Sequence, residues 1–259
     1  MVQKKCQKSK KQDGKLKMAV DYKQKDRYNI EDLREIMKIL RAPGGCPWDA
    51  EQDHESIKKN FIEETYEVVE AINKQDTELL KEELGDVMLQ VVFHATMEEE
   101  KGVFNLDDVA DGICKKLIER HPHVFGDISV NNTDEVLTNW DAIKRNSKKQ
   151  KTTTQAMDSV PRELPALMRA SKLQSKAAKS GVEVNCDVAE YVFHKASEVR
   201  SEVSEKTVGE LMFAAVAAAR LAGIDPEEAL TKVSDKFLNT FAEYEKSTDE
   251  EKKSFVLYY

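Results

Sequence analysis

The sequence predicts an all-α fold. Apolar residues recur with helical spacing along most of the chain, and no stretch of four to eight residues alternates polar and apolar side chains as a half-buried strand would. Glycine and proline are scarce, at 10 and 6 of 259 residues, so few turns interrupt this pattern. We therefore expect long helices joined by short connections.

Nine helices are expected, each a periodic segment bounded by turn or capping residues. Pro43-Gly44-Gly45 would end the first helix, and Asn105 would cap the fourth. Gly181 follows the sixth, and Asp225-Pro226 would begin the last with a cap and a proline in the first turn. The expected ranges are 30–41, 56–73, 77–101, 106–120, 134–148, 163–180, 187–203, 206–222 and 226–246.

Charge is distributed unevenly along the chain. Residues 1–27 carry ten basic and three acidic side chains, a net charge of +7, so the remainder carries −15 of the total of −8. An acidic body has no general attraction for nucleic acid or anionic lipid. No apolar segment reaches the roughly 18 residues of a membrane span or forms a signal-peptide core. We expect a cytoplasmic protein that binds neither membrane nor nucleic acid, with a disordered basic tail; a nucleic-acid-binding tail is the less favoured alternative.

A polar run rich in Lys and Thr, 146–155, has no apolar face and predicts a linker. The flanking halves look like diverged copies, because the segment GDVML at 85–89 is echoed by GELMF at 209–213. Duplication of a helical unit explains this similarity, and chance likeness between apolar helices is the alternative. The expected organisation is a tail at 1–27, an N-terminal domain at 28–148, a linker at 149–160 and a C-terminal domain at 161–259.

The cysteines do not indicate a zinc or disulfide site. Cys6, Cys46, Cys114 and Cys186 stand far apart with no C-x-x-C pair, so reduced thiols are the simplest interpretation.

Acidic residues point to a metal site instead. Helix 56–73 is amphipathic, and alone its Glu64 and Glu67 would be typical of a solvated face. The next helix, 77–101, is apolar on nearly every side, so we expect it to be buried, yet Glu83, Asp86 and Gln90 share one stripe on it. Buried carboxylates must be paired with cations or bound to a metal ion.

A short connection at 74–76 makes these two helices antiparallel neighbours, so Glu64 and Glu67 can face Glu83 and Asp86. Four convergent carboxylates suit a hard divalent cation, Mg²⁺ first and Mn²⁺ second. Iron is disfavoured because paired Glu-x-x-His motifs on helices are missing, and the chain has no Gly-containing EF-hand loop for calcium. Because Mg²⁺ held by carboxylates usually binds substrate phosphates, the site predicts a phosphate-bearing ligand.

Basic and aromatic candidates for that ligand follow later in the chain. Lys116 and Arg120 share a helical face, where they could meet phosphates or merely complement the helix dipole. Trp140 and Lys144 have the same spacing, and Trp140 could stack on a base or pack in the core.

These motifs carry a resemblance to a known family. Glu63-Glu64-x-x-Glu67, followed by Glu83-x-x-Asp86, resembles the metal signature of the MazG family of all-α nucleoside triphosphate pyrophosphohydrolases. The resemblance spans nearly all of residues 29–245. The other matching motifs are GCPWD at 45–49, ELGD at 83–86, RHPHVF at 120–125, Trp140 with Lys144, and PRELPALMRA at 161–170.

The resemblance implies Mg²⁺-dependent hydrolysis of nucleoside triphosphates between the α and β phosphates, giving the monophosphate and pyrophosphate. It also implies two such domains per chain and homodimers in which the helical units pack as four-helix bundles. Carried over by position, the site residues are metal ligands Glu64, Glu67, Glu83 and Asp86, a general base at Glu63 or Glu64, phosphate-binding Lys81, Lys116 and Arg120, and Trp140 and Lys144 toward the nucleoside.

The second half departs from the family pattern. Gly209 is matched to Gly85, and Glu198-Val199 to Glu67-Val68, with a shorter connection between the two helices. This places His194, Lys195, Glu198, Thr207 and Glu210 at the positions of Glu63, Glu64, Glu67, Glu83 and Asp86, respectively. We expect that this half holds no catalytic metal and serves packing, dimerisation or regulation. Two alternatives to the expected activity remain: a nucleotide-binding module with little turnover, and a phosphatase that releases orthophosphate.

Overall fold

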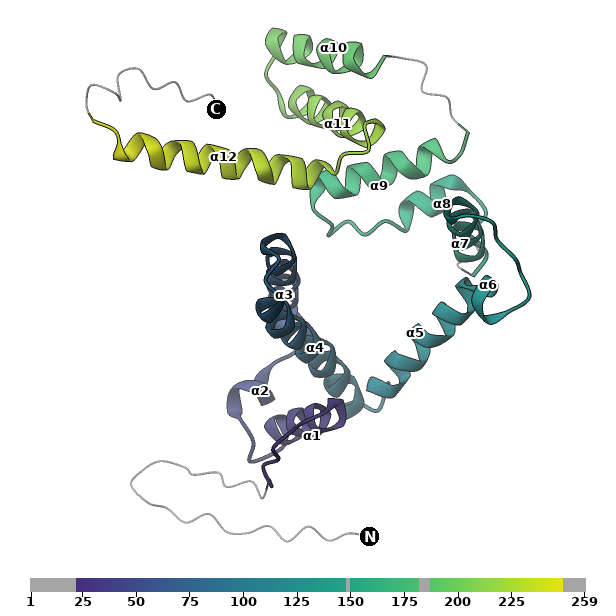
Figure 1. Cartoon of the computed structure of the whole chain (residues 1–259), viewed down its shortest axis with the longest axis vertical. Coiled ribbons are helices and arrows are strands. Elements are labelled where there is room, and N and C mark those ends of the chain that lie inside the picture. The colour runs from purple at the N-terminus through teal and green to yellow at the C-terminus, as the bar shows by residue number, and fades with distance from the viewer. Residues whose placement is uncertain (1–21, 148–149, 182–186, 249–259) are drawn as a thin grey trace. The chain divides into compact units, whose positions relative to one another are not determined.

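The computed structural model describes residues 22–147, 150–181 and 187–248, and every regular element in these ranges is an α-helix. This confirms the predicted fold class. Most of the basic tail, together with Cys6 and Cys186, lies outside the described residues. The chain divides into two compact units, residues 1–129 and 130–259, which are treated separately below (Figure 1).

All nine expected helices are present, with ends that agree to within three residues. The structure adds three short helices, too brief to leave a periodic pattern, and one of them, α8, lies in the expected linker. The helices of the first unit are α1 (Ile30–Arg41), α2 (Pro47–Glu51), α3 (His54–Lys74), α4 (Thr77–Glu100), α5 (Leu106–Arg120) and α6 (Pro122–Phe125). Those of the second unit are α7 (Thr133–Ser147), α8 (Thr153–Asp158), α9 (Ala166–Ala178), α10 (Val188–Ser201), α11 (Glu205–Leu221) and α12 (Pro226–Lys246).

A tight turn sets α3 and α4 side by side as an antiparallel hairpin. Gln75 adopts a left-handed backbone with φ of 55°, which ends α3. The amide of Asp76 then donates to the carbonyl of Ala71, at 3.1 Å, while its carboxylate accepts from the amides of Glu78 and Leu79 and starts α4. The turn therefore fixes the register in which the two helices face each other.

The hydrophobic core of the first unit lies at the far end of this hairpin from the turn. Met37 of α1, Ile57 of α3 and Val92, Phe93 and Met97 of α4 form one buried cluster. The core covers only the C-terminal half of α4.

The expectation that α4 is buried throughout is therefore wrong for its N-terminal half. Leu84 and Met88 are 48% and 47% exposed there. The cause is geometric, since α1 packs only beside the C-terminal half and α5 turns away from the hairpin after α4 (Figure 1).

Arg41 ties α1 and α2 to α4. Its guanidinium forms a two-pronged ion pair with Glu100, with distances of 2.8 and 2.9 Å, and donates to the carbonyls of Asp49 and Gln52. It also lies 5.3 Å from the centre of the Phe93 ring. Because its side chain is only 8% exposed, these bonds hold the α2 loop firmly against the hairpin.

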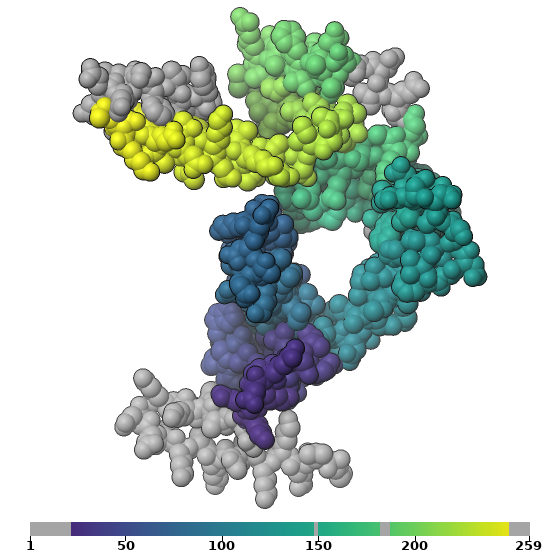
Figure 2. Space-filling view, viewed as in Figure 1, coloured from purple at the N-terminus to yellow at the C-terminus, as the bar shows by residue number. Residues whose placement is uncertain are grey.

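The second unit repeats the hairpin with α10 and α11, and α9 packs against α11. Figure 2 shows α12 projecting from α9 and α11 as an extended rod. Within the described ranges, no single helix is long and apolar enough to cross a membrane; α11 and α12, bent by 107°, meet that test of length and composition only as a pair.

Candidate metal centre

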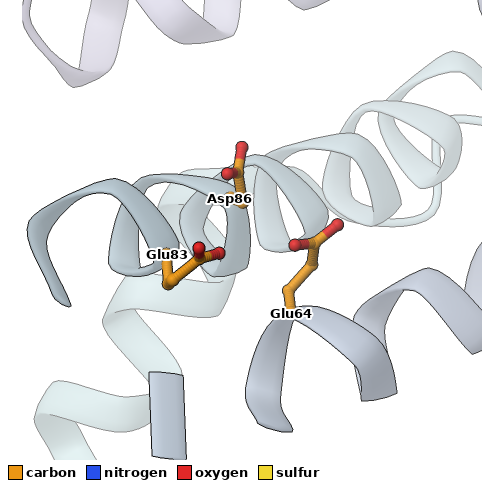
Figure 3. A group of neighbouring side chains, drawn as sticks. All are labelled: Glu64, Glu83 and Asp86. Atoms are coloured by element: carbon orange, nitrogen blue, oxygen red, sulfur yellow. The ribbon is translucent and has the colours of Figure 1, made fainter. Parts of the chain in front are cut away.

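Three carboxylates meet between α3 and α4 (Figure 3). Glu64 projects from α3 and Glu83 and Asp86 from α4, and one oxygen of each lies within 4.8 Å of the others. Each side chain is half-buried. The antiparallel hairpin and the i, i+3 spacing of Glu83 and Asp86 together produce this convergence.

Glu67 completes the predicted set of four, although its oxygens do not belong to the tight group of three. Burial raises the pKa of Glu64, and a hydrogen bond shared with Glu67 raises this pKa further. Burial also raises the pKa of Glu83, followed by the charges of Glu67 and Asp86. All four carboxyl groups therefore interact electrostatically.

The pKa shifts indicate that negative charge is crowded in this cluster, because burial and neighbouring carboxylates raise the pKa of both Glu64 and Glu83. The nearby lysines of the hairpin pair with other acids: Lys74 with Glu70, and Lys81 with Glu78. A hard divalent cation would supply positive charge among the four carboxyl groups, so these residues fit such an ion.

Two predicted residues of the hairpin lie apart from the carboxylate group. Glu63 precedes Glu64 on α3 but is exposed, because one step along a helix turns a side chain by about 100°. The Lys81 ammonium lies 3.5 Å from the Glu78 carboxylate, and its side chain is 80% exposed. Their expected roles as general base and phosphate ligand remain predictions.

The remaining candidates for ligand binding do not come from the α3–α4 hairpin. Lys116 and Arg120 lie near the C-terminal end of α5, which diverges from the α3–α4 hairpin (Figure 1). Trp140 and Lys144 lie on α7, in the second unit. Their contribution to nucleotide binding therefore remains a prediction.

A second polar group on the same hairpin was not predicted. The Nδ1 atoms of His54 and His94 lie 2.7 Å apart, and His54 Nε2 lies 2.6 Å from a Glu98 carboxylate oxygen. Burial lowers the pKa of His94, with the nearby His54 as the second cause. On the same side of α4, Gln90 is 7% exposed, and its buried Oε1 has no hydrogen-bond partner. The only sequence signal was that Gln90 and His94 follow Asp86 along one stripe.

In the second unit, a lysine side chain supplies positive charge to the carboxylates of the corresponding hairpin. The Lys195 ammonium lies 2.9 Å from Glu198 and 2.7 Å from Glu210, and these two hydrogen bonds raise its pKa. The same interaction lowers the pKa of Glu210. Thr207, which aligns with the predicted ligand Glu83, is engaged in the N-terminal capping box of α11. The α10–α11 hairpin thus neutralises its carboxylates with a covalently attached charge.

Comparison with known proteins places this geometry in a family. A family model described as the MazG nucleotide pyrophosphohydrolase domain matches residues 52–125, which include all four carboxylates. The chain is 42% identical to the nucleoside triphosphate pyrophosphohydrolase of Escherichia coli (strain K12), over 84% of this chain and 87% of that protein. It is 39% identical to the nucleoside triphosphate pyrophosphohydrolase/pyrophosphatase MazG of Thermotoga maritima, over 83% and 85% of the two chains.

A further relative is longer. The chain is 45% identical to the uncharacterized protein YabN of Bacillus subtilis (strain 168), and the match covers 86% of this chain but 48% of YabN. It therefore spans about half of YabN and most of the E. coli enzyme. The identity and coverage, together with the family model over the carboxylate hairpin, show that the chain belongs to the MazG family of nucleotide pyrophosphohydrolases.

Proposed function

We propose that the first unit hydrolyses nucleoside triphosphates between the α and β phosphates, with Mg²⁺ as cofactor, giving a nucleoside monophosphate and pyrophosphate. The observation that carries this proposal is the convergence of Glu64, Glu83 and Asp86, with Glu67 close enough to raise the pKa of Glu64. The activity that the names of the E. coli and T. maritima relatives state supports the same reaction class.

Glu64, Glu67, Glu83 and Asp86 would hold the ion. When bound, Mg²⁺ would offset the charge of the polyphosphate and stabilise the pyrophosphate leaving group. Mn²⁺ can substitute because it accepts the same oxygen ligands.

The protein's own residues would position the ligand and accept the proton of the attacking water. We favour Glu64 over Glu63 as this base, because Glu64 is half-buried beside Glu83 and Asp86 whereas Glu63 is exposed. Lys81, Lys116 and Arg120 would contact the phosphates, and Trp140 and Lys144 the nucleoside. Within the first unit, α5 does not bring Lys116 and Arg120 to the carboxylates, and Trp140 and Lys144 belong to α7 of the second unit. The proposed role of these four residues in ligand binding therefore depends on how units or subunits assemble.

We further propose that the chain acts as a cytoplasmic homodimer and that the second unit, with Lys195 in the place of a ligand, holds no catalytic metal. Support for a dimer comes from the uncovered apolar face of the α3–α4 hairpin, since pairing two such hairpins would give a four-helix bundle.

A product-resolved assay tests the proposed reaction. A panel of nucleoside triphosphates is incubated with the protein in Mg²⁺ or in EDTA, and monophosphate, pyrophosphate and orthophosphate are separated. We expect equal amounts of monophosphate and pyrophosphate, formed only with Mg²⁺. Orthophosphate as the first product would indicate a phosphatase, and tight nucleotide binding without turnover would indicate a binding module.

The matched pair Glu83→Gln and Glu82→Gln assigns the activity to this site. Replacing Glu83 removes a ligand charge without changing side-chain size, so kcat/KM for pyrophosphate release should fall by about 100-fold. Glu82 is exposed and lies about 100° around α4 from Glu83, and its replacement should leave the rate within about twofold. Equal rates for the two variants would contradict the proposal and would place the active site elsewhere.

A further inference from the structure

Two histidines join the start of α3 to the C-terminal half of α4. His54 is the first residue of α3, and its Nδ1 atom lies 2.7 Å from Nδ1 of His94 on α4. The two imidazole rings are nearly parallel, with an angle of 5° between their planes. On its other side, His54 Nε2 lies 2.6 Å from a carboxylate oxygen of Glu98, one turn after His94. The three side chains form one continuous hydrogen-bonded row.

The positions of the protons in this row follow from its acceptor. Hydrogen bonds with Lys101 and His54 lower the pKa of Glu98, so at neutral pH Glu98 is a carboxylate that can only accept. His54 Nε2 must then carry a hydrogen, and Nδ1 of the neutral His54 ring is an acceptor. The donor between the rings is therefore Nδ1 of His94. With both rings neutral, each of the two contacts has one donor and one acceptor.

One additional proton leaves the row intact, but a second does not. When His54 alone is charged, its two N–H groups donate to Glu98 and to Nδ1 of His94, which accepts in its other tautomer. When both rings are charged, two N–H donors and two positive charges meet across the 2.7 Å between the Nδ1 atoms. This arrangement is repulsive and has no acceptor between the rings, so the rings must separate.

Neighbouring charges do not relieve this repulsion. Glu98 faces only His54 in the row and also accepts from the Lys101 ammonium, at 2.6 Å. Asp53, beside His54, accepts from the amide of Ser56 in the cap of α3. The charged groups that α1, α3 and α5 bring nearby pair with other residues; these pairs are Lys38 with Glu99, Arg41 with Glu100, Lys58 with Glu55, and Arg34 with Asp107.

The row lies at the end of the α3–α4 hairpin opposite the turn at Gln75. Ile57, one turn after His54, belongs to the buried core, and the centre of the Phe61 ring lies 5.8 Å from that of His94. Core packing therefore holds α3 from Ile57 onward. Before that residue, His54 ties the first turn of α3 to α4. Separation of the rings would free this turn and leave the core in place.

We propose that His54 and His94 form a pH-sensitive clasp, which fastens the first turn of α3 to α4 at neutral pH and releases it in mildly acidic solution when both rings are protonated. The His54 side chain is 42% exposed, so protons reach the pair from solvent. The clasp is a contact between two helices and does not depend on the activity proposed for the carboxylate cluster.

The sign of the pH dependence follows from His94. Burial lowers the pKa of His94, and the charge of His54 lowers it further. In the open state a free imidazole takes up its proton near pH 6.5, whereas the closed clasp resists this proton until a lower pH. Opening therefore becomes more favourable as the pH falls below about 6.5, by up to about tenfold for each pH unit.

Hydrogen exchange of the full chain in EDTA, followed by mass spectrometry of peptides that cover residues 54–62, tests the clasp. The measured rates are corrected for the intrinsic effect of pH on exchange. We expect the protection of this segment in the wild type to fall by at least about fivefold between about pH 7.5 and about pH 5.

His94→Gln separates titration from contact. A glutamine amide can donate to a neutral His54 and accept from a charged one, so it keeps the contact without taking up a proton. Protection of residues 54–62 in this variant should change by less than about twofold over the same pH range. His194→Gln, at a histidine of the second unit that is 69% exposed, is the matched control and should follow the wild type. Circular dichroism of each variant verifies that it folds.

Equal pH dependence in the wild type and His94→Gln would overturn the proposal, as would a wild type whose protection does not fall. A titration followed by nuclear magnetic resonance adds a test on the wild-type protein. The imidazole signal that is absent from His94→Gln should titrate below the ordinary value of about 6.5. Titration of this signal at about 6.5 or above would show that the contact does not resist a second proton, and would also overturn the clasp.

Discussion

Glu64 holds its proton more tightly than a carboxyl group in water, because burial and the hydrogen bond with Glu67 both raise its pKa. Glu83 behaves in the same way, for burial and for the charges of Glu67 and Asp86. Without a cation, charging these groups at neutral pH opposes folding. The same repulsion would favour binding of a divalent ion, so the carboxyl groups that destabilise the metal-free protein are the ligands that we propose.

Glu64→Gln tests this directly. A carboxyl group whose folded-state pKa lies above its unfolded-state value destabilises the protein above the folded pKa, and this cost disappears as the pH falls below both values. In EDTA the variant should therefore unfold at higher urea concentration than the wild type near pH 7, and the difference should vanish toward pH 4. Mg²⁺ should reverse the order at pH 7 by stabilising only the wild type.

Urea unfolding of both proteins at several pH values provides the measurement, with Glu63→Gln as the exposed neighbouring control. A pH-independent difference between Glu64→Gln and the wild type would show that the Glu64 carboxyl is not perturbed by the cluster.

At the scale of elements, two similar hairpins handle converging carboxylates differently. The α3–α4 hairpin leaves Glu64, Glu83 and Asp86 facing one another, ready for a soluble ion. In α10–α11 an ammonium takes part in the structure itself, between Glu198 and Glu210. The Lys195 ammonium is part of the chain and balances the charge of α10–α11 without any bound ion. The charge balance of α3–α4 would instead depend on whether a metal ion is bound.

Lys195→Met should therefore destabilise the second unit. Removal of the ammonium leaves Glu198 and Glu210 facing each other, and we expect Tm at pH 7 to fall by about 2–4 °C. Because Lys195 lowers the folded-state pKa of Glu210, its contribution is present above the unfolded-state pKa and is lost as the pH falls through the folded value. The variant and the wild type should therefore converge in acid.

Scanning calorimetry of Lys195→Met and Lys206→Met separates this effect from general loss of charge. Lys206 is 81% exposed and lies 4.0 Å from Glu210, so its replacement should shift Tm by less than about 1 °C under the same conditions. Similar shifts for the two variants would mean that Lys195 has no special role.

At the scale of the whole molecule, α3 and α4, the helices that carry the carboxylates, also expose large apolar side chains. Ile62 and Tyr66 of α3 are each 55% exposed, and Leu84 and Met88 of α4 are nearly as open. Contiguous apolar faces of this kind usually mark a protein interface. A second copy that covers this face would also deepen the burial of Glu83 and Asp86.

The double variant Leu84→Asp/Met88→Asp should consequently give monomers and lose pyrophosphate release, since charge on this face opposes pairing. Light scattering coupled to size-exclusion chromatography measures the mass. Val103→Asp, at a residue 67% exposed in the α4–α5 connection, should remain dimeric and active. A wild-type protein that is monomeric and fully active would refute the dimer and its role in catalysis.

The sequence by itself determined the helical fold class, the ranges of the long helices and the convergence of Glu64, Glu83 and Asp86, because helix periodicity and a three-residue turn are local properties. Only the tertiary structure decided how deeply α4 and its carboxylates are buried, since the exposure of Leu84 and Met88 depends on what packs against α4. It likewise revealed the contact between His54 and His94, which lie 40 residues apart in the chain and meet because the hairpin folds back. Long-range proximity and burial are consequences of packing, and no periodic pattern within a single helix records them.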